Sequence, residues 1–329
     1  MKNIKIIYSV IFTLLTFIFT PSLYAGEEFG YTLTTDVVYG EGIIAPNGKE
    51  QTRNLLMDVY QPSGKEDLQN KPAVILVHGG AFHRGGLRQP PYQEAGAVHS
   101  RVEDYARLLA PLGYTVFTLE YRLAPEFPVP EMKVESELLE PYRDAITESG
   151  LRRTNMARGF MGLPALPDND HGKLVIWNTV LSAAEDINKA VMHIRESSSK
   201  YGIDKDKIAM GGHSAGAATV LNATYGLKSP VTAIFPLSPP VLGFDMEKVI
   251  DSPELPPMLL VMSQNDEPAV AEQIPSFLKT ASHAGLKYNY IWVPGFNHFY
   301  PTGAVSLGDD GRRMSVGDRV IDFLEEHLK

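Results

Sequence analysis

The sequence contains no cysteine in 329 residues. This absence excludes disulfide bonds, thiolate metal ligands, a cysteine nucleophile and a lipid anchor attached through cysteine. Stability must therefore come from the hydrophobic core, and a chain of this length can bury a large one.

Positive charge is also scarce, with 30 Lys and Arg against 39 Asp and Glu and a formal net charge of -9. Such a balance argues against a general nucleic-acid or anionic-membrane surface. No Walker motif and no GxGxxG pattern follows a strand-like segment, and Asp168–Asp170 is too short for a calcium loop. We therefore expect no cofactor and no metal.

Long apolar runs are missing after the N-terminus. The first residues combine Lys2 and Lys5 with an apolar stretch over 6–19, and Ala25 offers a small residue before a cut. This layout predicts a signal peptide over residues 1–25. A membrane anchor is the alternative, but the run is short and no basic cluster follows it. We expect a secreted or periplasmic protein without stable membrane insertion after cleavage.

The rest of the chain alternates strand-like and helix-like segments. Two early segments, 31–39 and 54–60, alternate apolar and polar residues as half-buried antiparallel strands do. Later strand-like segments are apolar throughout, as in a sheet covered on both faces: 72–77, 115–119, 207–210, 231–235, 258–262 and 288–293. Helical periodicity is found over 102–112, 180–197, 269–284 and 316–328.

This order of segments predicts the α/β class. We expect a mostly parallel central sheet with antiparallel N-terminal strands and helices on both faces. No internal repeat or low-complexity linker divides the chain, so residues 26–329 are predicted to form one domain.

Residues 126–178 interrupt the alternation. The segment is long and proline-bearing, yet it holds apolar residues such as Phe160 and Trp177 that a disordered tail would not need. Long connections in compact domains commonly act as lids. We interpret the segment as a partly helical, lid-like insert, with a solvent-facing decoration as the alternative.

The stretch Gly212-His213-Ser214-Ala215-Gly216 lies between an apolar strand and a helix-forming run. In that context GxSxG predicts a nucleophile elbow, a sharp turn that exposes the serine hydroxyl. Flanking glycines avoid clashes with neighbouring backbone, and the helix N-terminus favours negative charge. Ser214 is the predicted nucleophile.

A serine nucleophile needs a base and an orienting acid, here expected in the order Ser, Asp or Glu, then His. His298 follows the strand 288–293, whereas His283 and His327 lie in helical patterns. Asp266 follows the strand 258–262, and Glu267 is the reserve acid. His298 and Asp266 are therefore the predicted base and acid, because open α/β sheets place chemistry at strand ends.

The predicted oxyanion hole uses backbone N–H groups. Gly79 and Gly80 directly follow the strand 72–77, where small residues let the backbone turn into the site. With the N–H of Ala215 they would bind the negative oxygen. His78 is expected to brace this loop, and His83 and Arg84 could face either pocket or solvent.

Four segments together resemble a known family: HGGAF at 78–82, EYRLAPE at 120–126, YGIDKDKI at 201–208 and GHSAG at 212–216. They are similar to the α/β-hydrolase fold serine esterases, in the hormone-sensitive-lipase-like and carboxylesterase-like branch. The resemblance covers most of residues 50–329. It implies the α/β-hydrolase fold, the same triad and oxyanion hole, and structural roles for Arg122 and Glu126.

The chain departs from that branch at three points. His213 stands where the lipase-like members usually have Asp, and the Ser-to-Asp interval is 52 residues, from 214 to 266. The segment that supplies part of the family's cap is cut to about 238–256, so the insert at 126–178 is the candidate replacement. The acyl and alcohol pockets of that branch therefore cannot be assigned to residues of this chain.

These residues predict hydrolysis of a small-molecule carboxylic ester through an acyl-enzyme. A peptidase or amidase on the same scaffold is one alternative. A catalytically silent binding protein is another, although the complete Ser, Asp, His and glycine set argues against it. The sequence does not predict the oligomeric state.

Overall fold

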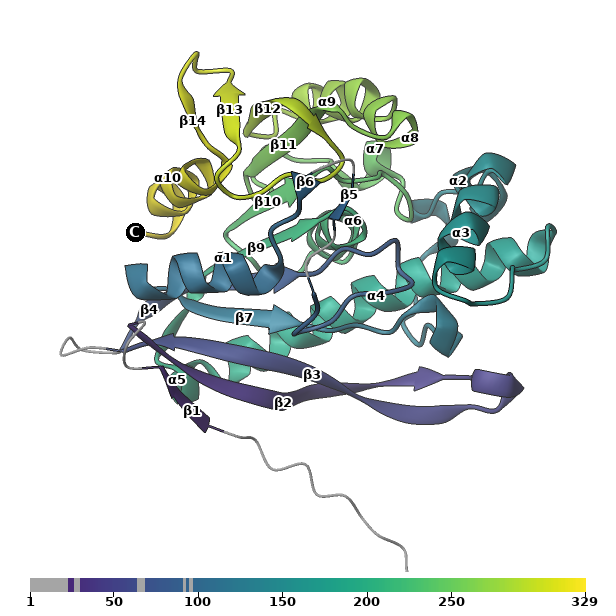
Figure 1. Ribbon diagram of the computed structural model, residues 1–329, viewed down its shortest axis with the longest axis horizontal. Coiled ribbons are helices and arrows are strands. Elements are labelled where there is room, and N and C mark those ends of the chain that lie inside the picture. The colour runs from purple at the N-terminus through teal and green to yellow at the C-terminus, as the bar shows by residue number, and fades with distance from the viewer. Residues whose placement is uncertain (1–22, 27–29, 64–68, 91–92, 95–96) are drawn as a thin grey trace, which may run out of the picture.

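A computed structural model describes residues 23–26, 30–63, 69–90, 93–94 and 97–329. Residues 1–22 of the predicted signal peptide lie outside the described residues. The central feature of the fold is a twisted mixed sheet (Figure 1). Its strands are β1 (Leu23–Gly26), β2 (Tyr31–Ile44), β3 (Gln51–Pro62), β4 (Lys71–Val77), β7 (Thr115–Leu119), β8 (Pro128–Val129), β9 (Ile203–His213), β10 (Ala233–Leu237), β11 (Met258–Asn265), β12 (Tyr288–Asn297), β13 (Val305–Gly308) and β14 (Arg313–Ser315).

The strand order in this sheet is β1-β2-β3-β7-β4-β9-β10-β11-β12-β13-β14, with β8 paired to β2. The strands from β7 to β12 run parallel, and β1, β2 and β3 pair antiparallel at one side. A separate small hairpin joins β5 (Gln93–Glu94) to β6 (Ala97–Val98). The predicted sheet is confirmed. Most of its apolar strands are central and buried, as in β4, β7, β10 and β11, whereas β12 alternates buried and more exposed residues.

The helices are α1 (Val102–Leu109), α2 (Tyr142–Ala145), α3 (Glu148–Phe160), α4 (Asp170–Glu196), α5 (Ser198–Tyr201), α6 (Ala215–Leu221), α7 (Met246–Val249), α8 (Pro268–Ala271), α9 (Ile274–His283) and α10 (Val316–Leu328). Shorter turns are η2 (Pro46–Gly48), η3 (Ala110–Leu112), η4 (Ala124–Glu126), η5 (Ser136–Leu138) and the π-helical η6 (Asn222–Gly226). None of the helices in the described part of the chain combines the length and apolar character that crossing a membrane requires.

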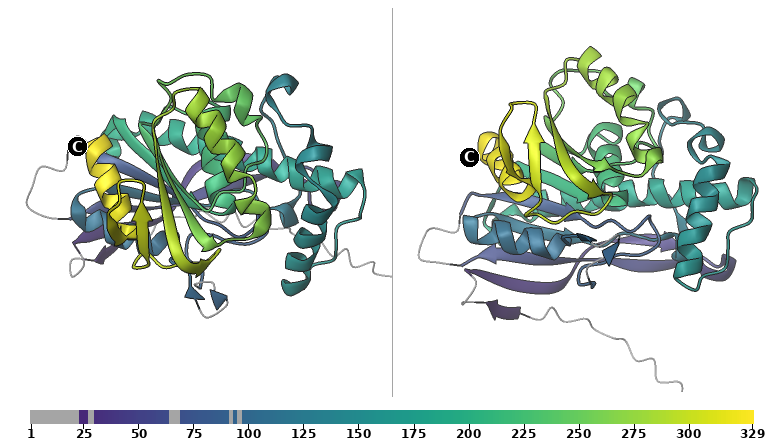
Figure 2. Two further views of the ribbon diagram at one scale, coloured as in Figure 1. Left: turned by 90° about the horizontal axis from the view of Figure 1, so that it is seen from above. Right: turned by 45° about the horizontal axis from the view of Figure 1, so that its top comes forward.

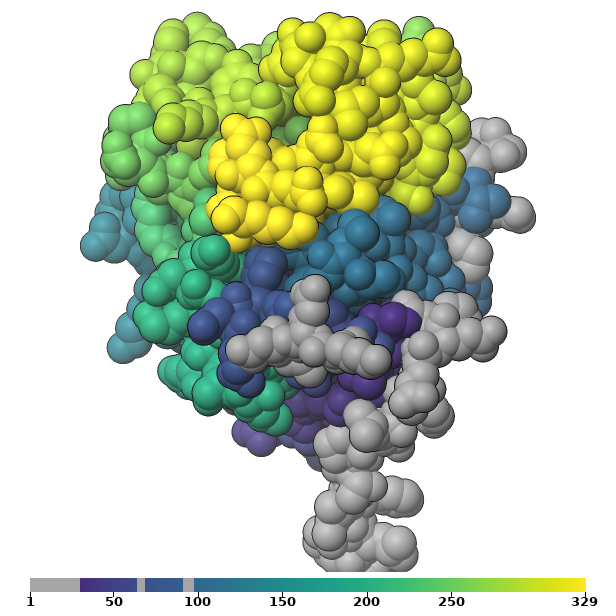
Figure 3. All heavy atoms as spheres, turned by 90° about the vertical axis from the view of Figure 1, so that its left-hand side faces the viewer, coloured from purple at the N-terminus to yellow at the C-terminus, as the bar shows by residue number. Residues whose placement is uncertain are grey.

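Two hydrophobic cores lie on opposite faces of the sheet. α4, α6, α7 and α9 pack on one face, and α1 and α10 pack on the other. Figure 2 shows these layers from two further directions. In Figure 3 the yellow C-terminal segment lies directly against the blue segment that holds α1. Helices thus cover both faces, as the sequence predicts.

Several element boundaries differ from the predicted ones, and prolines explain two of them. The helix expected over 102–112 ends as α1 at Leu109, and Pro111 lies in the 3-10 turn that follows. The helix expected over 269–284 is divided into α8 and α9, with Pro275 in the first turn of α9. Proline has no N–H for an internal helical bond but is tolerated in a first turn. The hairpin β13–β14 was not predicted.

α4 begins ten residues before the predicted 180, at Asp170. The side chain of Asn169 caps it by accepting hydrogen bonds from the N–H groups of His171 (3.0 Å) and Gly172 (3.3 Å). Residues 170–178 of the expected insert therefore belong to a long helix that packs on the sheet. The irregular part of the insert ends before this cap.

The remainder of the insert is attached to the main sheet at its base. β8 pairs with β2, and Leu139 forms a bridge with Phe244. α2 and α3 then project at one end of the sheet (Figure 1). Leu151 of α3 is fully buried, so this segment is packed rather than loosely appended.

Arg122 is the largest fully buried side chain of the described residues. Its guanidinium donates to the Asp186 carboxylate on α4 at 2.7 Å, and to the carbonyl oxygens of Ile43 and Val129 at 2.8 Å each. These bonds join β2, β8 and α4 at one point. The Glu126 carboxylate accepts a 2.7 Å bond from the Leu123 N–H within the neighbouring turn.

Candidate active site

Ser214 occupies a sharp turn between β9 and α6. Its φ is 54° and its ψ is -123°, in the left-handed half of backbone space that costs energy for a residue with a side chain. A Cβ on Gly216 would lie 2.2 Å from the Val77 carbonyl oxygen, and one on Gly212 would lie 2.7 Å from the Gly216 carbonyl carbon. Only glycine fits at these two positions, which is why Ser214 can stand at the turn.

His298 follows β12 and lies beside this serine. Its Nε2 is 2.7 Å from the Ser214 Oγ, and its Nδ1 is 2.6 Å from the Asp266 Oδ1. A carboxylate only accepts hydrogen bonds, so Nδ1 carries the proton and Nε2 accepts one from the serine hydroxyl. The structure therefore brings the three predicted residues together, with the His298 Nε2 free to accept the serine proton.

Asp266 follows β11 and is buried. Burial opposes its charged form, but the hydrogen bond and charge of His298 and further bonds from Ser238 and the Glu267 N–H outweigh that penalty. The pKa of this carboxyl is consequently lowered. The Glu267 carboxylate instead lies 3.6 Å from the Arg153 guanidinium on α3, so the reserve acid does not contact the base.

Three side chains that the sequence analysis missed support this acid. The Ser238 Oγ donates to the Asp266 Oδ2 at 2.5 Å, and the Ser263 Oγ donates to it at 3.1 Å. The Tyr300 hydroxyl lies 3.1 Å from the Ser238 Oγ. Ser238 follows β10, the strand between β9 and β11, so its position at a strand end was the available signal.

The predicted oxyanion loop lies against the elbow. A Cβ on Gly79 would lie 2.8 Å from the His213 carbonyl oxygen and 3.4 Å from the Ser214 Cβ. Gly80 has a φ of 121°, and Ala81 has a φ of 54°, in the region that glycine favours. This close approach places the backbone of the loop beside the serine, and Ala215 begins α6 directly after the serine.

The two histidines of the same loop are buried and hold its backbone. The His78 Nδ1 lies 2.8 Å from the Gly79 carbonyl oxygen, and its ring stacks on Tyr121 with centroids 4.4 Å apart. Burial lowers the pKa of His78 to about 4, against a smaller opposite effect of that hydrogen bond. The His83 Nδ1 lies 2.7 Å from the Ala81 carbonyl oxygen. Neither ring reaches the serine.

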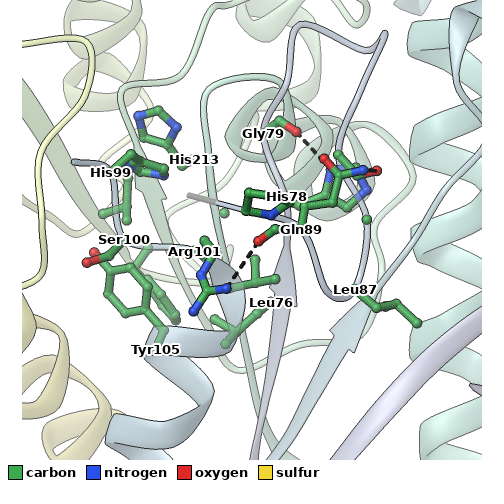
Figure 4. Close-up of a pocket in the computed structure, with 17 residues that line it drawn as sticks. Leu76, His78, Gly79, Leu87, Gln89, His99, Ser100, Arg101, Tyr105 and His213 are labelled. Atoms are coloured by element: carbon green, nitrogen blue, oxygen red, sulfur yellow. Dashed lines mark hydrogen bonds between the residues drawn. The ribbon is translucent and has the colours of Figure 1, made fainter. Parts of the chain in front are cut away.

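A cavity of about 1060 Å³ opens above the serine. Ser214, His298, Gly80 and Ala215 line it, and so do Arg84 and fourteen residues of the insert between Glu140 and Met161. Gly79 lines a smaller neighbouring cavity of about 40 Å³ (Figure 4). The insert thus forms one wall of the space in front of the predicted nucleophile.

Within the described residues, no cluster of three or more His, Asp or Glu side chains is arranged to hold a metal ion. The remaining histidines that follow Ser214 are remote from it, with His283 exposed on α9 and His327 on α10.

Comparisons with known proteins agree with this architecture. A family model described as BD-FAE, an esterase-like α/β-hydrolase family, matches residues 174–251, which include Ser214 but neither Asp266 nor His298. No match to the chain was found among curated protein sequences.

Two similar solved structures are of a thermophilic esterase from the planctomycete Thermogutta terrifontis. The butyrate-bound form is 14% identical with a TM-score of 0.52, and covers 88% of this chain and 91% of its own. The native form is 14% identical with a TM-score of 0.50, and covers 88% and 90%. These similarities show the α/β-hydrolase fold and confirm the predicted likeness to esterases.

Proposed function

We propose that the protein is a serine hydrolase that cleaves carboxylic esters through Ser214, His298 and Asp266. The observation that carries this proposal is the continuous hydrogen-bond chain of 2.7 Å and 2.6 Å from the serine hydroxyl to a buried carboxylate. A serine is a poor nucleophile without such a base and orienting acid.

The geometry supports the following steps. The Ser214 Oγ bonds to the ester carbonyl carbon while its proton moves to the His298 Nε2. Backbone N–H groups of Gly79, Gly80 and Ala215 would bind the oxyanion. The bond to the alcohol then breaks, and the same proton leaves with the alcohol. Water attacks the acyl-enzyme with His298 as base, releasing the carboxylic acid and restoring the serine.

Purified Ser214→Ala protein tests the assignment. Hydrolysis of p-nitrophenyl acetate should fall by about 10³-fold or more, because the acyl-enzyme cannot form. A far-UV circular dichroism spectrum and thermal transition like those of the wild type would show that the variant is folded. Unchanged turnover in the folded variant would overturn the proposal.

The two alternative functions are distinguished by separate measurements. Matched ester and amide substrates with the same acyl group would identify an amidase, which would turn over both at comparable rates. A fluorophosphonate probe should label Ser214, since labelling needs the activated hydroxyl. No labelling of folded wild-type protein would favour a silent binding protein.

We further propose that the insert acts as the cap of the site and contributes to substrate binding. Its support is the insert's place on the cavity wall and the exposure of Met156 (63%) and Phe160 (85%), both of which line the cavity. Replacing both by serine should raise KM about fivefold for bulky esters, through loss of apolar contact. KM for p-nitrophenyl acetate should not change, and an equal rise for both substrates would contradict the proposal.

The size of the cavity also supports a substrate larger than an acetate ester, since ligand cavities of roughly 300–1,000 Å³ enclose drug-sized molecules. A panel of acyl-chain lengths and aryl esters, with feruloyl and acetylated sugar esters included, would identify the preferred class. A preference for the smallest acetate esters would contradict this expectation.

We propose that residues 1–25 are removed on export and that residues 26–329 form a single secreted or periplasmic domain. The composition of the first 25 residues supports this. Cleavage after Ala25 would remove most of β1, which pairs with the edge of β2. N-terminal sequencing of the protein recovered from culture fluid or periplasm tests the site. A retained leader would contradict it.

A further inference from the structure

His213 is the one large residue in the elbow sequence, and neither the resemblance nor the proposed reaction gives it a role. It ends β9 next to Ser214 and is only 5% exposed. His213 lines two cavities, the large one that Ser214 also lines and the small one that His99 also lines. Figure 4 shows it beside His99 at the small cavity.

The His213 ring is bonded to the backbone of the predicted base. Its Nε2 lies 2.8 Å from the carbonyl oxygen of His298, in a contact that both residues bury. A carbonyl oxygen only accepts, so Nε2 carries the proton and donates. The residue before the nucleophile therefore holds the peptide group of the base directly.

Two aromatic neighbours keep this ring in place. The His99 ring packs on it with centroids 3.9 Å apart, and the Tyr300 ring meets it edge-on at 5.8 Å and 84°. The Tyr300 hydroxyl lies 3.1 Å from Ser238, which donates to Asp266. The segment 298–300 is thus bonded to the elbow through His298 and to Ser238, which holds Asp266, through Tyr300.

Burial favours the neutral form of this ring. Burial, followed by the positive charges that His99 and His298 can carry, sets the pKa of His213 well below its usual value, against a smaller effect of the bond to His298. Burial likewise lowers the pKa of His99 to about 4. A neutral imidazole adds no charge next to His298, which would become positively charged on taking the serine proton.

We propose that His213 is a positioning residue that holds the peptide of His298, and thereby its imidazole, between Ser214 and Asp266. This inference rests on the proposed function of these three residues. Displacement of a catalytic group by about 1 Å can reduce the rate roughly a hundredfold. The donated bond is the only feature of His213 that this role requires.

A matched pair of variants isolates that bond. In His213→Gln the amide nitrogen can reach the position of the imidazole Nε2 and donate, whereas His213→Met has similar length and no donor. Alanine is unsuitable because it would remove the packing of the ring against His99 and Tyr300 together with the donor. We expect kcat for p-nitrophenyl acetate to fall about 10- to 100-fold in His213→Met with KM nearly unchanged, and to recover largely in His213→Gln.

A second readout does not depend on turnover. The His298 Nδ1 lies 2.6 Å from the Asp266 Oδ1, and the proton in this short hydrogen bond should give a far-downfield proton NMR resonance. It should broaden or shift in His213→Met and stay near the wild-type position in His213→Gln. Thermal unfolding of both variants establishes how much of each is folded.

The outcomes separate the two proposals. Equal kcat in folded His213→Met and wild type, with the NMR resonance unmoved, would overturn the positioning role while leaving the esterase proposal intact. Equal loss in both variants would also overturn it, because packing and not the donor would then be responsible. An inactive wild type would contradict the proposed function, and the NMR comparison would still test whether His213 orients His298.

Discussion

At the scale of single residues, the site depends on a carboxylate that is kept charged although it is buried. Asp266 accepts hydrogen bonds from His298, Ser238 and Ser263 and from the Glu267 N–H. These donors stabilise the charge that burial opposes. They also hold Asp266 in an orientation in which it accepts the hydrogen bond from the His298 Nδ1–H, and in the proposed reaction this bond would select the reactive tautomer.

Replacing Asp266 by Asn should preserve the size of the side chain and remove this selection. We expect kcat to fall about 10⁴-fold, because the amide favours the wrong imidazole tautomer. Steady-state kinetics with p-nitrophenyl acetate measures the effect. Glu267→Gln is the matched control and should keep activity near the wild-type level, since that carboxylate faces Arg153. A larger loss in the control would assign the acid to Glu267.

A second carboxyl, Glu140 on the cavity wall, should make stability depend on pH. Burial, with the charges of Asp245 and Asp144, raises its pKa from 4.5 to about 7. Because the folded-state pKa exceeds the unfolded one, this contribution to stability is complete at low pH and is lost as pH rises towards 7.

Glu140→Gln should therefore be more stable than the wild type at alkaline pH and similar to it at acid pH. Urea unfolding at about pH 5 and about pH 8.5 should show a difference on the order of 1 kcal/mol, since partial exposure screens the charge. Glu137→Gln, an exposed change in the same segment, is the control. A constant offset at both pH values would contradict the prediction.

At the scale of elements, Ser214, the proposed nucleophile, is positioned by a contact between β4, β9 and α6. Gly212 and Gly216 allow the start of α6 to pass within contact distance of the Val77 carbonyl oxygen. The helix then begins directly under Ser214. Any side chain in this contact would push the helix away from the sheet.

Gly216→Ala should consequently lower the free energy of unfolding by about 1–3 kcal/mol through overpacking, and should reduce activity by moving Ser214. Gly159→Ala is the matched control, because nothing lies within 4 Å of the added Cβ in α3. It should stabilise the protein by about 0.5–1 kcal/mol. Chemical denaturation compares the two, and equal effects would refute the role assigned to close contact.

At the scale of the whole molecule, a buried ionic cluster joins the N-terminal strands to the helical layer. The side chains of Arg122 and Asp186 are both fully buried, and Glu185 also contacts the guanidinium at 3.2 Å. Because Arg122 also holds backbone carbonyls of β2 and β8, the cluster ties the base of the insert to α4.

Arg122→Met should lower the free energy of unfolding by about 3–5 kcal/mol, because Asp186 is left charged and buried. Adding Asp186→Asn should restore part of it. Arg312→Met removes ion pairs with Asp310 and Asp322 in which the arginine is 59% exposed, and should lower the free energy of unfolding far less. Urea unfolding measures all three, and similar losses for Arg122→Met and Arg312→Met would contradict the structural role.

The sequence by itself determined the α/β fold class, the parallel core strands and the positions of Ser214, Asp266 and His298. These follow from local patterns: apolar strands, a glycine-flanked serine, and polar residues at strand ends. The start of α4 at 170 and the division of the helix at 269–284 were less visible, because capping by Asn169 and the place of Pro275 compete with apolar periodicity.

Only the tertiary structure decided what the residues around the triad contact. Ser238 and Ser263 contact Asp266, and Tyr300 contacts Ser238. His213 contacts the peptide of His298, 85 positions away. Their partners follow other strands of the sheet, and a sequence pattern does not show which side chains meet at the carboxyl ends of the strands. The wall that the insert forms over Ser214 has the same origin.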